Sequence, residues 1–239
     1  MRAAEDHHWW YRALRDVIRL HWERHVAVPR PRLLDVGCGT GANLALLAPS
    51  SEPAGIDVAP EAVAACRERG LVATAVASAA SLPFGPESFD VVLSCDVLGH
   101  RSLADRALPL REMARVLRPG GLVLLNLPAF QWLLSPHDEA YGQDRRFTRR
   151  EAVLLLQAAG FEPVAASYWN TFLFPAAVAS RLARRRSGRA GSDLAVGAGR
   201  AAAGMLASVL ALEYRLLRLV PLPVGLSLFI VGRKRPLEG

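Results

Sequence analysis

The stretch Leu33-Leu34-Asp35-Val36-Gly37-Cys38-Gly39-Thr40-Gly41 indicates the fold class of this chain. A short apolar run passes through an acidic residue into three glycines at every second position, which is typical of a buried strand that enters a ligand-binding turn. Glycine lets the backbone adopt positive φ and approach a bound molecule, because no Cβ intervenes. The dinucleotide fingerprint is G-x-G-x-x-G, with a pyrophosphate at the following helix. Here the third glycine comes one residue early, which predicts a nucleoside-like ligand without the diphosphate.

Strand-like runs alternate with helical patterns on either side of this turn, which predicts β-α-β units and an α/β fold. Strands are expected at residues 32–36, 71–76, 89–94, 122–127, 161–168 and 225–232, with one more that ends at 57. Helices are expected at 5–26, 42–47, 103–117 and 148–159, and another begins at Pro60. Thr148 and Glu151 have the spacing of a capping box, and residues 128–147 are expected to form a long irregular loop.

Composition favours one sizeable α/β domain with an elaboration, since the chain has 239 residues and 51% hydrophobic content. The three cysteines, Cys38, Cys66 and Cys95, are scattered and lack metal-ligand spacing, so reduced thiols are expected. The start of the chain does not resemble a signal peptide, and no run reaches the roughly 18 apolar residues of a membrane span. These features predict a cytoplasmic protein with no metal site.

The net charge of +7 comes almost wholly from arginine. Five arginines cluster at Arg181, Arg184, Arg185, Arg186 and Arg189. Stacking aromatics are not interleaved with them, so no nucleic-acid partner is expected. Two interpretations of this cluster stay open, a solvated helix end and a surface for an anionic ligand or membrane.

Asp57 closes the second expected strand. In a nucleotide-binding α/β unit, an acid at this position accepts hydrogen bonds from ribose hydroxyls. Asp35 and Asp57 would then lie at adjacent strand ends and flank the glycine turn.

Four segments together carry a family resemblance: LLDVGCGTG (33–41), GIDVAPEAV (55–63), SLPFGPESFDVVLSCDVLGH (81–100) and LRPGGLVLLNLP (117–128). In this order they resemble the motifs of class I S-adenosylmethionine-dependent methyltransferases, and in particular the group that includes ubiquinone- and menaquinone-biosynthesis enzymes. The resemblance covers about residues 30–170. The flanking HHWWYR (7–12) and SPHDEAYGQDRRFTRREA (135–152) look like an uncharacterised bacterial branch of these enzymes.

The resemblance implies S-adenosylmethionine as cofactor and S-adenosylhomocysteine as product. Asp35 would lie near the ammonium end, Asp57 would hold the ribose and Val58 would pack on the adenine. The full set of expected cofactor contacts is Asp35, Gly37, Cys38, Gly39, Gly41, Asp57, Val58, Ser78, Ala79 and Cys95. The chain departs from the family at Ser78, where relatives often carry an acid that bonds the adenine amino group, and at Gly99, where many relatives carry an acid before the histidine.

The resemblance also implies a Rossmann-like, seven-stranded, mainly parallel sheet whose last strand runs antiparallel between the fifth and sixth. We expect an N-terminal helical lid at 1–30, the cofactor-binding core at 31–171, a helical insertion at 172–222 and the final strand within 223–239. In the insertion, Met205, Val209, Leu212, Leu216 and Leu219 repeat at helical spacing. Together with Leu206, Leu210 and Leu217 they predict a wide apolar helical face. This face is interpreted as core packing, a homodimer surface or a lipid contact.

Three residues are candidates for catalysis, namely His137, His100 and Tyr141. His137 has a pKa range suited to proton abstraction, and the alternative is a loop histidine bonded to local backbone. Expected substrate contacts are Trp9, Trp10, Tyr11, Trp132, Arg145 and Arg146. The adjacent Trp9 and Trp10 predict either a lid or core packing, and the arginines either bind an acidic substrate or form a solvated turn. His137, Asp138 and Glu139 are adjacent in sequence, and three adjacent residues are not expected to converge on one metal ion.

The predicted function is in-line methyl transfer to a hydroxyl or amine of a small molecule, for which positioning supplies much of the acceleration and a histidine base is optional. Three alternatives stay open: a methyltransferase for lipid-linked or polyprenyl substrates at a membrane surface, a non-catalytic S-adenosylmethionine-binding protein, and an NAD-dependent oxidoreductase.

Overall fold

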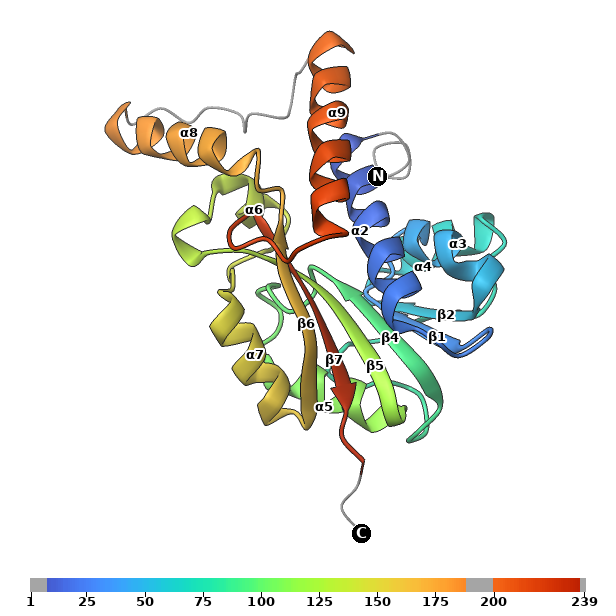
Figure 1. Ribbon diagram of the computed structural model, residues 1–239. Helices are drawn as coiled ribbons and strands as arrows, with labels where there is room; N and C mark the ends of the chain where they lie inside the picture. The colour runs from blue at the N-terminus through green and yellow to red at the C-terminus, as the bar shows by residue number, and fades with distance from the viewer. Residues whose placement is uncertain (1–7, 188–199, 237–239) are drawn as a thin grey trace.

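Within residues 8–187 and 200–236, which the computed structural model describes, seven strands form one sheet in the order β3-β2-β1-β4-β5-β7-β6 (Figure 1). The strands are β1 Arg32–Val36, β2 Glu52–Asp57, β3 Thr74–Val76, β4 Phe89–Cys95, β5 Leu117–Pro128, β6 Phe161–Trp169 and β7 Ser227–Lys234. Side chains of residues 137, 182–187 and 200–208 lie outside the description.

Strands β1 to β5 pair in parallel, whereas β7 pairs antiparallel with both β5 and β6. This confirms the predicted place of the last strand. Because β6 therefore points the same way as β5, its carboxyl end lies at the same edge as those of the parallel strands. The strand order reverses between β1 and β4, and ligands of open α/β sheets bind in the crevice at such a switch point.

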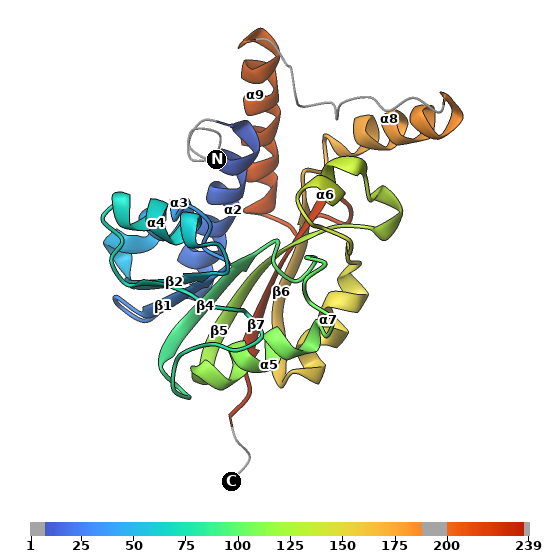
Figure 2. The same ribbon diagram turned by 180° about the vertical axis from the view of Figure 1, so that it is seen from behind.

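Helices cover both faces of the sheet (Figures 1 and 2). One face carries α2 Trp9–His25, α3 Ala42–Leu47 and α4 Pro60–Glu68, and α9 Arg200–Leu217 lies beside α2. The other face carries α5 Ala107–Val116 and α7 Arg149–Ala158. Two helices, α6 Pro136–Ala140 and α8 Phe174–Ser187, lie at the carboxyl edge, and the 3₁₀ turns are η1 Ala48–Ser50 and η2 Gln131–Leu133.

Several element boundaries follow local chemistry. The predicted capping box of α7 is confirmed, since Thr148 and Glu151 each accept from the other's backbone N–H. Helix α5 begins at Ala107 and not at 103, because the Asp105 carboxylate accepts from the Ala107 N–H at 2.8 Å and forms a turn. The 128–147 segment was wrongly predicted as wholly irregular, since η2 and α6 form within it.

The apolar face predicted for α9 is confirmed in part. The helix buries Leu210 and Leu217 of that face together with Glu213, whereas Leu212 is exposed and the exposed Leu219 follows the end of the helix. The buried carboxylate of Glu213 explains the difference, because it accepts from the Phe172 backbone N–H at 3.1 Å and so turns its own side of the helix inward. Met205, which belonged to the predicted face, lies outside the described side chains.

Candidate active site

Three left-handed glycines shape the turn between β1 and α3. Gly37, Gly39 and Gly41 have φ of +80°, +53° and +82°. A Cβ at Gly37 would overlap the side chain of Val97, and one at Gly41 would lie 2.6 Å from Leu71 Cδ1. The positive φ confirms the backbone conformation that the sequence predicts, and the close contacts with Val97 and Leu71 are a further reason why Gly37 and Gly41 must be glycine.

Asp57 lies directly against this turn. Its carboxylate accepts from the Gly39 backbone N–H at 2.9 Å and from the Ala59 N–H at 3.0 Å. Each carboxylate oxygen has a second lone pair, so both can still accept hydroxyl donors such as those of a ribose. The neighbouring Val58 side chain is 64% exposed, which leaves an apolar surface beside the acid for a planar ring.

Asp35 is fully buried at the end of β1, one strand away from Asp57. Burial, and then the Asp35 charge, raise the pKa of the Cys38 thiol and hold the pKa of Cys95 well above its usual value. The Cys38 thiol lies 3.8 Å from the Cys66 thiol in the core. Cys38 therefore directs its side chain inward, and only its backbone belongs to the turn.

Ser78 and Ala79 follow β3 at the same edge of the sheet. The Ser78 side chain is exposed and its oxygen accepts from the Ala80 N–H at 3.2 Å, which leaves its own proton free to donate. Ala79 is buried. The adenine contact of this pair stays a prediction.

Asp96, Asn126 and Trp169 are polar site residues that the sequence analysis did not single out. Asn126 Nδ2 donates to both carboxylate oxygens of Asp96 at 3.1 Å, and Trp169 Nε1 donates to Asn126 Oδ1 at 2.8 Å. Asp96 follows the last residue of β4, and Asn126 lies opposite that residue in β5. The available signal was a lone asparagine in the apolar run of β5.

His100 is held in the loop after β4. Its Nδ1 lies 2.7 Å from Ser102 Oγ and accepts from the Ser102 N–H at 3.2 Å, while its ring rests against Gly142. A Cβ at Gly99 would overlap Gln143 and the Arg145 carbonyl. Glycine at the position where relatives carry an acid therefore lets the 142–145 segment pack closely against this loop.

The remaining catalytic candidates lie around α6. The helix contains His137, whose side chain is outside the described part of the structure, and Tyr141 follows it with 63% exposure. Trp132 is 46% exposed and packs against Phe130 and Phe174, with ring centroids 6.0 Å apart in both pairs. The roles of these residues stay predictions.

Both candidate arginines have protein partners. Arg146 is buried and donates to both Asp138 oxygens, at 3.1 and 2.7 Å, and to the Ala129 carbonyl. Arg145 pairs with Glu151 at 2.6 Å. These contacts fasten the loop after β5, and substrate binding by either residue stays a prediction.

The aromatic residues at the start of α2 make different contacts. The Trp10 ring packs on Trp169, with centroids 5.7 Å apart, and Tyr11 meets Trp10 edge-on at 5.0 Å. Trp10 thus joins the N-terminal helix to the carboxyl end of β6, close to the Asn126 contact. Trp9 is half-buried beside it.

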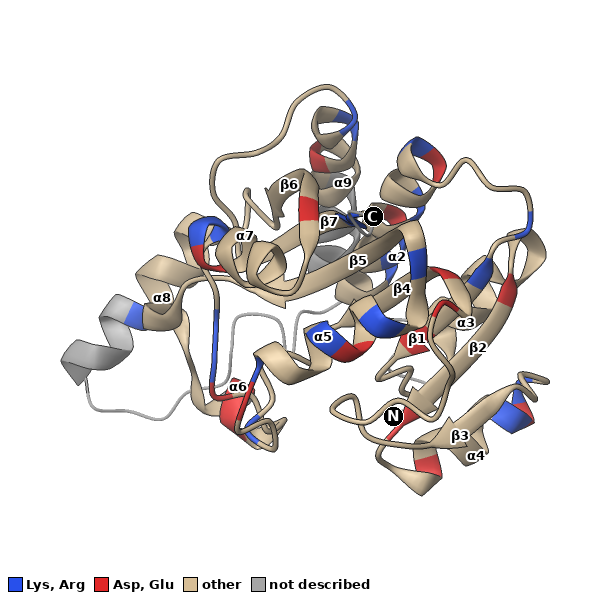
Figure 3. Cartoon of the chain, turned by 90° about the horizontal axis from the view of Figure 1, so that it is seen from below, with Lys and Arg blue, Asp and Glu red and all other residues tan. Residues whose placement is uncertain are grey.

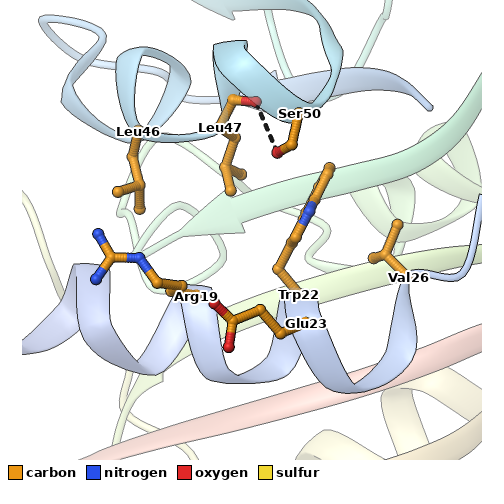
Figure 4. Close-up of a pocket in the computed structure, with 7 residues that line it drawn as sticks. All are labelled: Arg19, Trp22, Glu23, Val26, Leu46, Leu47 and Ser50. Carbon is orange, nitrogen blue, oxygen red and sulfur yellow. Dashed lines mark hydrogen bonds between the residues drawn. The ribbon is translucent and has the colours of Figure 1, made fainter. Parts of the chain in front are cut away.

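A separate groove of about 400 Å³ lies between α2 and the carboxyl end of α3 (Figure 4). Arg19, Trp22 and Glu23 form one wall, and Leu46 and Leu47 form the other. The glycine turn is at the opposite end of α3, so this groove is not part of the candidate active site.

In the face shown in Figure 3, basic and acidic segments alternate along α5, in agreement with the Arg111–Asp105 and Arg115–Glu112 ion pairs.

The described residues contain neither a metal-ligand cluster nor a membrane-spanning helix. No group of three potential ligands there is arranged to hold a metal ion. None of the described helices is long and apolar enough to cross a membrane.

A doubly wound sheet, a glycine turn at the switch point and an acid at the end of β2 define a Rossmann-like nucleoside-binding domain. Residues 34–125 match the family model described as a methyltransferase domain. The chain thus carries a class I S-adenosylmethionine-dependent methyltransferase domain.

Known proteins with similar sequences are methyltransferases. Demethylmenaquinone methyltransferase from Thermus thermophilus is 43% identical over 41% of this chain and 47% of its own length. The 27-O-demethylrifamycin SV methyltransferase from Amycolatopsis mediterranei is 30% identical over 60% of this chain and 58% of its own length. Others are named as tRNA methyltransferases, and the match spans 22% of the human one. This chain thus covers only part of its relatives.

Among solved structures, the [4+2]-cyclase SpnF has a TM-score of 0.62 and 27% sequence identity, over 95% of this chain and 82% of its own. The same fold therefore occurs in a protein described by a different reaction.

Proposed function

We propose that this chain transfers a methyl group from S-adenosylmethionine to a hydroxyl or amine of a small molecule. The observation that carries the proposal is the Asp57 carboxylate, which is bonded to the glycine turn and retains lone pairs beside the exposed Val58. An acceptor carboxylate beside an apolar side chain fits the hydroxyls and the ring of an adenosyl group. Asp57 would hold the ribose hydroxyls, Val58 would contact the adenine, and the buried Asp35 charge would favour the cationic end of the cofactor.

When bound, the cofactor supplies a methyl group already activated on a sulfonium. The protein therefore needs only to hold the acceptor in line, to exclude water and to receive a proton where the acceptor carries one. The carboxyl ends of β4, β5 and β6 carry polar and aromatic side chains that would support an acceptor held at this edge of the sheet.

Calorimetric titration and label transfer together test the proposal. S-adenosylhomocysteine is expected to bind, and labelled methyl from S-adenosylmethionine is expected to enter the small-molecule fraction of an extract of the native host. Label in the RNA fraction would instead identify a nucleic-acid acceptor, in line with the tRNA methyltransferases among the relatives. Tight NADH binding without binding of S-adenosylhomocysteine would favour the oxidoreductase alternative.

The likeness to a [4+2]-cyclase favours a second candidate, a protein that binds the cofactor without transferring its methyl group. Binding of S-adenosylhomocysteine with no label in any fraction would support this candidate.

The exposed rings of Trp132 and Phe172 at the carboxyl edge favour an apolar or lipid-linked acceptor. Co-sedimentation with anionic vesicles at low salt, together with label in the lipid fraction, would support that acceptor class.

A further inference from the structure

A line of hydrogen bonds joins three strand ends at the candidate active site. Trp169 at the end of β6 donates to Asn126 in β5, and Asn126 donates to Asp96 directly after β4. Trp169 and Asn126 are almost completely buried, whereas Asp96 is half-buried. The line therefore runs from the core to the half-buried Asp96 directly after β4.

The chemistry of the three groups fixes the direction of this line. An indole N–H can only donate, so the Asn126 amide must present its oxygen to Trp169. Its NH₂ group then faces Asp96, with both carboxylate oxygens 3.1 Å from the nitrogen. Packing of Trp10 on the Trp169 ring, at 5.7 Å, holds the indole in place. The Asn126 amide therefore cannot exchange its oxygen and NH₂ group, and it holds the Asp96 carboxylate in one orientation.

The backbone at Asp96 is held in an uncommon conformation. Its φ is +59°, and its N–H and carbonyl are bonded to the Asn126 carbonyl and the Gln143 side chain. Strained backbone of this kind persists where the surroundings over-determine it, often at functional sites. The next residue, Val97, packs directly on Gly37, so Asp96 is adjacent to the glycine turn that the cofactor requires.

We propose that Asp96 accepts the proton released by the methyl acceptor, and that Asn126 and Trp169 are its positioning residues. The proposal rests on the methyl-transfer function above. A lone pair of the acceptor oxygen or nitrogen forms the bond to the methyl carbon, while the carbon–sulfur bond breaks and its electron pair stays on sulfur. The acceptor proton passes to the Asp96 carboxylate and then to solvent, so charge and atoms balance.

The electrostatics of the site suit this role. Burial raises the pKa of Asp96 to about 7, against the opposing effects of the Asn126 hydrogen bond and the Arg146 charge. Asp138 raises it further, and the Cys95 thiol beside it stays protonated. A base with a pKa near the working pH is partly ionised and still binds a proton well. His100, by contrast, is already bonded to Ser102.

Three measurements on the full chain test the proposal, with Asp16→Asn as the matched control because Asp16 is half exposed on α2. Carbon-13 NMR of labelled aspartate, assigned by the signal lost in Asp96→Asn, should show a carboxyl that titrates near pH 7. In Trp169→Phe the amide loses its fixed orientation, and this pKa should rise. Label transfer into host extract should fall about 100-fold or more in Asp96→Asn. The affinity of Asp96→Asn for S-adenosylhomocysteine should stay within about threefold of the wild-type value.

The outcomes separate the two proposals. Wild-type label transfer in Asp96→Asn, or a carboxyl that titrates near pH 4, would overturn the role of Asp96 and leave the methyltransferase function standing. A wild-type protein that transfers no label would overturn both. An Asp96 pKa unchanged in Trp169→Phe would remove Trp169 from the positioning residues.

Discussion

The Asp57 carboxylate and the Gly39 backbone N–H are joined by a hydrogen bond of 2.9 Å. The acid that would hold the ribose is thus the same group that fixes the middle of the glycine turn. Two parts of one ligand site, separated in sequence by helix α3 and strand β2, are therefore coupled before any ligand binds.

We expect Asp57→Asn to weaken binding of S-adenosylhomocysteine by about 10- to 100-fold, because an amide NH₂ would face a backbone N–H and one oxygen acceptor would be lost. Calorimetric titration measures the change. The exposed Asp16→Asn serves as the control and should bind as the wild type does. An unchanged affinity in Asp57→Asn would refute the assignment of the ribose contact.

Gly37→Ala should lower the free energy of unfolding by about 3 kcal/mol, because it combines positive φ with an overlap on Val97. Gly120→Ala is a matched control, since Gly120 has φ of +77° but open space around its Cβ position, and about 1 kcal/mol is expected there. Urea unfolding gives both values. Equal losses would mean that contact with Val97 does not constrain the turn.

Breaking the buried Arg146–Asp138 pair should be costly. Both side chains are only 10% exposed, so Arg146→Met would leave a buried charge without its main partner, at about 3–5 kcal/mol of stability. The Arg111–Asp105 pair is half exposed, and Arg111→Gln should cost less than about 1 kcal/mol. Denaturant unfolding compares the two. A similar small loss in both variants would show that the loop after β5 does not depend on this pair.

His21 should make stability depend on pH. Burial, followed by the charges of His25 and Arg24, lowers its pKa from 6.5 to about 3, and its ring stacks on Phe229 at 4.6 Å. The pKa of His21 is lower in the folded than in the unfolded chain. The free energy of unfolding is therefore highest above pH 6.5 and decreases as the pH falls toward 3. Between pH 8 and pH 5 the wild type should lose about 2 kcal/mol more than His21→Phe.

Thermal or urea unfolding of both proteins at the two pH values measures this difference. His25 titrates in both chains, so the comparison isolates His21. Parallel pH curves for the two proteins would contradict the prediction, whatever their absolute stabilities.

Part of the fold and of the candidate site could be predicted because the sequence signals are local. The glycine turn, Asp57 and the capping box of α7 each occupy a few consecutive residues, and each lies where its pattern indicates. The place of β7 between β5 and β6 followed from the family resemblance and is confirmed by the pairing.

The rest of the candidate site depends on contacts between residues that are far apart in the sequence. Asp96 is separated from Asn126 by 30 residues, and Asn126 from Trp169 by 43, so no local pattern links them. The same holds for the buried face of α9, which is set by the contact of Glu213 with the Phe172 backbone 41 residues away. Hydrophobic spacing alone places Leu210, Leu212 and Leu217 on one wide face, and it does not indicate that Leu212 is exposed or that Glu213 is buried.

The position of β7 also has a consequence for synthesis of the chain. Strands β5 and β6 meet only through β7, which is made after both of them. When the nascent chain has emerged only up to residue 220, the edges of β5 and β6 that pair with β7 are still unpaired. Such edges can pair wrongly with other strands. The sheet can close only after translation has passed residue 234, so we expect the nascent chain to depend on chaperones until that point.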